Sequence, residues 1–138
     1  MTPRSLAAAS AFTWVAIALA AAGCSTAGAP PPTLLAATTC SPNCATFVGI
    51  YKVRPGQVDL GNDVYHLTWG SWTSASARGH GVSVTEVMGF VERWKVDVVA
   101  ARVRRGTFTR LTVVVFQGGR VYRSTLRLQH TDTGPDWY

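Results

Sequence analysis

The feature that most constrains the fold is the pair Gly118-Gly119, which separates two runs of strand-forming residues, 107–117 and 120–130. Two glycines between such runs favour the primed two-residue turn of a β-hairpin. Placing Gln117 opposite Arg120 fixes the register of every other pair, since a one-residue slip would exchange the two faces. In this register the apolar side chains share one face: Leu111, Val113, Val115, Tyr122, Leu126 and Leu128.

Further short runs of β-branched, aromatic and alternating apolar residues fill the chain before this hairpin, and turn-forming residues separate them. They are Thr46–Val53, Val58–Leu60, Val64–Trp72, Gly79–Val87 and Phe90–Arg104. The pattern predicts an all-β fold, a small antiparallel sandwich or partly open barrel of five to seven strands. No helix of consequence is expected outside the N-terminal segment.

The N-terminal segment has the three parts of an export signal. Arg4 precedes an uncharged, alanine-rich run, Leu6 to Ala22, which is followed by Gly23 and Cys24. The ending resembles the lipobox of bacterial lipoproteins, in which the cysteine is alkylated by a diacylglycerol and becomes the new N-terminus. Two alternatives stay open: cleavage after an Ala-x-Ala site would release a soluble secreted protein, and an uncleaved run of about 20 apolar residues would span a bilayer.

The predicted organisation therefore has three parts. Residues 1–23 are the lipoprotein signal peptide, 24–39 the lipidated cysteine with a flexible, proline-rich linker, and 40–138 one β domain. The linker, an unfolded spacer of about 3.1 Å per residue, would reach about 45 Å. This places the domain on the extracytoplasmic face of the cell membrane.

Cys40 and Cys44 form an even pair once lipidation has used Cys24, and export would place them in an oxidising compartment. A structural disulfide is expected, closing a five-residue loop. A redox-active pair is the alternative, but no thioredoxin-like βαβ pattern follows it. Two thiols alone do not supply the four ligands that zinc requires.

Basic residues dominate the second half of the domain. From Arg93 to Arg127 there are nine, against the single acid Asp97. The hairpin register places Arg110 opposite Arg127, a pair of like charges that destabilises a sheet unless something compensates it. We expect Arg110, Arg123 and Arg127 to form a face for an anionic ligand, either lipid or cell-wall polymer. The alternative is a solvated face that keeps the sheet soluble.

Trp69 and Trp72 form the other distinctive pair. Positions three apart on a strand face opposite sides, so both reach the core only if a bulge intervenes, for which Gly70 is suited. A stacking platform for a ligand is the alternative. In the following run, Gly79-x-Gly81 is too short for a phosphate-binding loop.

No catalytic or metal-binding motif is present. His66, His80 and His130 lie in separate segments without an acid at metal-ligand spacing, and no Gly-x-Ser-x-Gly motif occurs. We therefore expect no enzyme activity, no metal and no cofactor. An envelope enzyme would need a cleft that brings His80 or His66 together with an acid.

The segment 53–84 resembles a group of uncharacterised exported actinobacterial proteins. The pattern of that group is a proline, a Trp-x-x-Trp motif and then Ala-x-Gly-x-Gly, matched here by Pro55, Trp69, Trp72, Ala77, Gly79 and Gly81. Their cysteine loop follows the tryptophans, whereas here it precedes them. The resemblance implies export and no particular activity.

Together these features predict a membrane-anchored lipoprotein whose basic β domain binds a ligand or supports the envelope. Its partners are the membrane, through the anchor, and an anionic lipid or wall polymer. Nucleic acid is excluded by export. The alternatives are an envelope enzyme and a structural spacer without a ligand.

Overall fold

The computed structural model describes residues 28–138, so the predicted signal peptide and Cys24 lie outside the described part. The described residues form nine strands and no helix, which confirms the all-β prediction, although the predicted number of five to seven strands is too low. No helix among them is long and apolar enough to cross a membrane. The strands are β1 (Leu34–Cys40), β2 (Phe47–Lys52), β3 (Gln57–Leu60), β4 (Asp63–Trp72), β5 (Ser76–Val87), β6 (Phe90–Arg104), β7 (Thr107–Gln117), β8 (Arg120–Thr131) and β9 (Gly134–Trp137).

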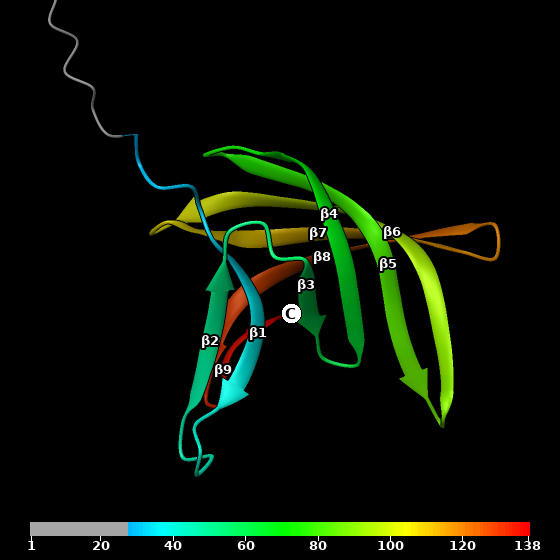
Figure 1. The fold of residues 1–138 in the computed structure, drawn as a ribbon, viewed down its shortest axis with the longest axis horizontal. Helices are drawn as coiled ribbons and strands as arrows, with labels where there is room; N and C mark the ends of the chain where they lie inside the picture. Colours follow the sequence, from blue (N-terminus) through cyan, green and yellow to red (C-terminus); the bar gives the residue numbers. More distant parts are fainter. Residues whose placement is uncertain (1–27) are drawn as a thin grey trace, which may run out of the picture.

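Strands β3 to β9 form one antiparallel sheet in chain order, and β1 and β2 form a separate hairpin. The sheet curls, and the β1–β2 hairpin packs between its ends, where β1 contacts β3 and β9 and β2 contacts β9 (Figure 1). The result is a nearly closed barrel. Its core is filled from both sheets, with Leu34, Val58, Val96, Phe108 and Leu111 almost fully buried.

The predicted β7–β8 hairpin is confirmed in turn and register. Gln117 pairs with Arg120, and Gly118 and Gly119 have φ values of 56° and 77°. Both angles lie in the left-handed region that glycine adopts without steric cost. Leu111 and Val113 of β7 are buried, as the alternation predicts, and Phe108 at the start of the strand is buried as well.

Small residues on the inner face of β5 allow the sheet to curl tightly. A Cβ at Gly81 would overlap the backbone carbonyl of His66 on β4, and one at Gly79 would lie 2.9 Å from the Trp69 ring. The Gly-x-Gly pattern therefore lets β4 approach β5 and makes room for an indole. The two glycines therefore have a packing role within the sheet and do not form a phosphate-binding loop.

The predicted linker is wrong at its C-terminal end. Residues 34–39 belong to β1, and Leu34 and Leu35 are 0% and 2% exposed. The domain starts before the predicted residue 40 because these leucines fill the core beside the last strand. Trp137 of β9 is also buried, and its indole Nε1 donates to the Leu35 carbonyl at 3.2 Å.

Candidate functional site

A cleft of about 630 Å³ opens beside the β6–β7 turn and is lined by five arginines and no acid. We call it the arginine cleft. Two threonines, a histidine, a tyrosine and a leucine complete its walls. The lining residues are Tyr51, Arg102, Arg104, Arg105, Thr107, Thr109, Arg110, Arg127, Leu128 and His130.

Left-handed backbone at the end of β6 shapes one wall of the arginine cleft. Arg102 and Arg105 have φ values of 56° and 49°, which are unusual for residues other than glycine. The Arg102 carbonyl accepts a hydrogen bond from the Thr109 hydroxyl at 2.7 Å. At this point the alternation of β7 changes, because Phe108 and Leu111 are both buried although they lie three residues apart.

This change of alternation leaves Thr109 and Arg110 next to each other in the wall of the cleft, both partly buried. Arg110 pairs directly with Arg127 of β8, as the sequence predicts. The Nε atom of Arg110 is buried and has no hydrogen-bond partner among the described residues. A buried donor without a partner is costly unless a ligand or water satisfies it.

The predicted anionic-ligand face is only partly gathered at the cleft. Arg110 and Arg127 line it, whereas Arg123 pairs with Val114 and is not among the lining residues. Arg123 lies four residues from Arg127 on β8, about 13 Å along a strand. The arginine cleft therefore extends from the hairpin towards the β6–β7 turn, away from Arg123.

Arg102, Arg104 and Arg105 belong to the nine basic residues found between Arg93 and Arg127, but the sequence pattern did not assign them to a site. Their clustering next to the turn after β6 could have indicated that they share one surface. Tyr51 could not be found from the sequence, because only the packing of the β1–β2 hairpin brings β2 to the cleft. Burial raises the pKa of Tyr51, so its hydroxyl stays protonated.

A smaller groove of about 410 Å³ lies between β4, β5 and β6, where it contains Ser71, His80 and Asp97. His80 pairs directly with Asp97 across two strands. This is the juxtaposition of histidine and acid that an envelope enzyme would need. Among the described residues, however, no hydrogen bond joins these side chains, and no group of three metal-ligating residues occurs. We therefore assign no catalytic role to this groove.

The two tryptophans pack inward. The β4 register shifts between Trp69 and Ser71, which confirms the predicted bulge. The two rings meet edge to face at 4.8 Å, and Trp72 also packs against Phe108 at 5.3 Å. Both indole nitrogens donate to backbone carbonyls, of Pro55 at 2.8 Å and of Pro32 at 2.9 Å. These contacts leave no stacking platform for a ligand.

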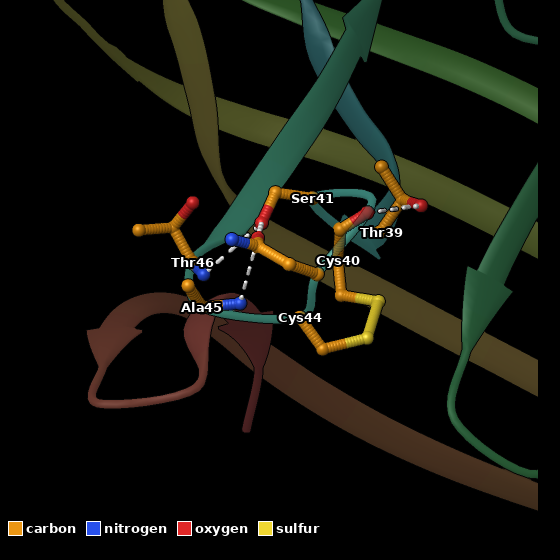
Figure 2. Close-up of a disulfide and its surroundings, with 7 residues drawn as sticks. Thr39, Cys40, Ser41, Cys44, Ala45 and Thr46 are labelled. Atoms are coloured by element: carbon orange, nitrogen blue, oxygen red, sulfur yellow. Dashed lines mark hydrogen bonds between the residues drawn. A yellow bond between two sulfur atoms is a disulfide. The ribbon is translucent and has the colours of Figure 1, made fainter.

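The predicted disulfide joins Cys40 to Cys44 in the β1–β2 loop (Figure 2). The Asn43 carboxamide oxygen accepts hydrogen bonds from the Ser41 hydroxyl at 2.8 Å and from the Ala45 amide at 3.3 Å. The bond and these contacts order a loop that carries no strand pairing.

No protein-family model matches the chain, and neither a curated protein nor a solved structure matches it. The arginine cleft is therefore interpreted from its own chemistry.

Proposed function

We propose that this chain is a membrane-anchored lipoprotein, held through Cys24, whose domain binds a multiply charged anionic ligand in the arginine cleft. The observation that carries the proposal is the convergence of five arginines, without an acid, on one cleft. Its volume of about 630 Å³ falls in the range of small-molecule sites, roughly 300–1,000 Å³.

Phosphate groups are the ligand chemistry that suits the cleft best. A guanidinium offers parallel N–H donors that bind two phosphate oxygens at once. The unsatisfied Nε of Arg110 supplies a donor inside the wall of the cleft. An anion placed between Arg110 and Arg127 would also relieve their mutual repulsion.

Calorimetric titration with pyrophosphate tests this proposal, using the chain from Cys24 onward. All core residues named above lie between Pro32 and Trp137, so this chain contains the complete domain. Arg127→Gln is expected to weaken binding about tenfold or more, since a charge-assisted hydrogen bond contributes about 1.5–3 kcal/mol.

Arg123→Gln is the matched control, because it removes the same charge from the same strand outside the cleft. Its affinity should stay within about twofold of the parent, as expected for a distant surface charge. Absence of pyrophosphate binding at low salt would refute the proposal. Equal weakening by both variants would refute the cleft as the site and leave only general charge attraction.

A further inference from the structure

The chain enters the described domain at the rim of the arginine cleft. Thr33 bridges to the β6–β7 turn, donating its amide to the Gly106 carbonyl at 2.8 Å and accepting from the Phe108 amide at 2.9 Å. Its hydroxyl lies 3.1 Å from that of Thr107, which lines the cleft. Figure 1 shows this blue segment passing the turn between β6 and β7.

Pro32, the residue before Thr33, is also held in place by the domain. Pro32 is buried, and its carbonyl accepts the Trp72 indole hydrogen bond at 2.9 Å. Only seven residues, 25–31, separate Cys24 from Pro32. A chain of this length spans at most about 28 Å, since each residue adds no more than about 3.6 Å. The predicted reach of about 45 Å is therefore too long.

At the opposite end of β6 the exposed side chains are apolar instead of basic. The β5–β6 turn exposes Met88 and Phe90 at 95% and 75%, so this apolar tip is the competing candidate for a membrane contact. However, Glu86 and Glu92 flank this tip, and about 40 Å of curved strand, measured along β6 from Phe90 to Arg102 at 3.3 Å per residue, lies between it and the cleft. An anchor attached beside the cleft holds the cleft, rather than this tip, next to a bilayer.

We infer that the arginine cleft binds the phosphate headgroups of anionic lipids in the same bilayer that holds the Cys24 anchor. This inference rests on the proposed function and names its ligand. A short tether raises the effective concentration of headgroups at the cleft far above that of a free phosphate compound. Each basic residue at an anionic membrane surface strengthens binding, and five of them converge in this one cleft.

The test attaches the chain from Cys24 to vesicles in two orientations. Cys40 and Cys44 are paired, so the Cys24 thiol alone reacts with a maleimide lipid. The matched control carries Met88→Cys together with Cys24→Ser, which anchors the domain by its opposite end. The vesicles contain phosphatidylcholine alone or phosphatidylcholine with phosphatidylglycerol.

The readout is the rate at which phenylglyoxal modifies each arginine, followed by peptide mass spectrometry. For the Cys24-anchored protein, phosphatidylglycerol should slow modification of Arg110 and Arg127 about tenfold relative to Arg123, the expected effect of an occupied charge-assisted site. The Met88→Cys anchor should give no such protection. Equal protection in both orientations, or none in either, overturns the inference.

Free pyrophosphate, added to the protein on phosphatidylcholine vesicles, separates the two proposals. If it protects Arg110 and Arg127 while phosphatidylglycerol does not, the cleft binds soluble phosphate compounds and only the headgroup inference fails. If neither protects them, the proposed function fails as well.

Discussion

Substituting Arg127 by threonine is expected to stabilise the protein in the absence of ligand. Arg127 directly faces Arg110 across the β7–β8 hairpin. Two unit charges held at the Cβ spacing of such a pair, about 5 Å, would repel by about 0.8 kcal/mol in water, which is an upper bound because the guanidinium groups extend well beyond Cβ. Because the Arg127 side chain is exposed and can turn towards solvent, we expect a gain of about 0.5 kcal/mol in the free energy of unfolding. In a domain of this size this raises Tm by about 2 °C.

Thermal unfolding followed by circular dichroism, at low and at high salt, measures this gain. Arg123→Thr is the control, since it removes the same charge and adds the same strand propensity but faces Val114. The Tm difference between the two variants should be largest at low salt and shrink as salt screens the charges. If Arg127→Thr melts no higher than Arg123→Thr at low salt, the like-charge argument is wrong. The same holds if the difference is unaffected by salt.

Three further predictions concern the barrel and its loop. Gly81→Ala should prevent folding or cost several kcal/mol in urea unfolding, because its Cβ would overlap a β4 carbonyl, whereas Gly56→Ala, in open space, should change stability by less than about 0.5 kcal/mol. Replacing Cys40 and Cys44 together by serine should lower the unfolding free energy by about 2 kcal/mol, the loop-closure value for five residues; an unchanged urea midpoint would contradict this. Burial and the neighbouring Asp63 charge raise the pKa of Tyr65 to about 12, above the unfolded value of about 10, so its contribution to stability is complete below pH 10 and lost as pH rises towards 12. Tyr65→Phe should flatten this alkaline loss in pH-dependent denaturation; an equally steep loss in the variant would exclude Tyr65 as its source.

The sequence predicts the central strands well because each of them has one buried and one exposed face. The bounds of β6, Phe90–Arg104, agree with the predicted run, and the β7–β8 turn and register follow from Gly118-Gly119. Strands β1 and β9 escaped prediction for physical reasons. β1 reads Leu-Leu-Ala-Ala-Thr-Thr-Cys without alternation and follows three prolines, and β9 contains a glycine and a proline, which normally mark turns.

The sequence predicts only the part of the arginine cleft that depends on pairing between neighbouring strands of one hairpin. Arg110 and Arg127 face each other because the hairpin turn fixes their register, so sequence is sufficient there. The other wall depends on the left-handed Arg102, which no alternation pattern specifies. Tyr51 depends on the packing of a hairpin far away in the sequence.

Several local costs fall together at the arginine cleft, and this concentration argues for a ligand rather than a spacer. Arg102 holds left-handed backbone inside β6, at a cost of about 1–2 kcal/mol for a residue with a Cβ. Arg110 faces a like charge and buries an Nε donor without a protein partner. A domain that served only as a spacer would gain stability from a glycine at position 102 or a threonine at position 127. Local conflicts of this kind persist at functional sites, where a bound ligand compensates them. A phosphate group would compensate the two electrostatic costs at once.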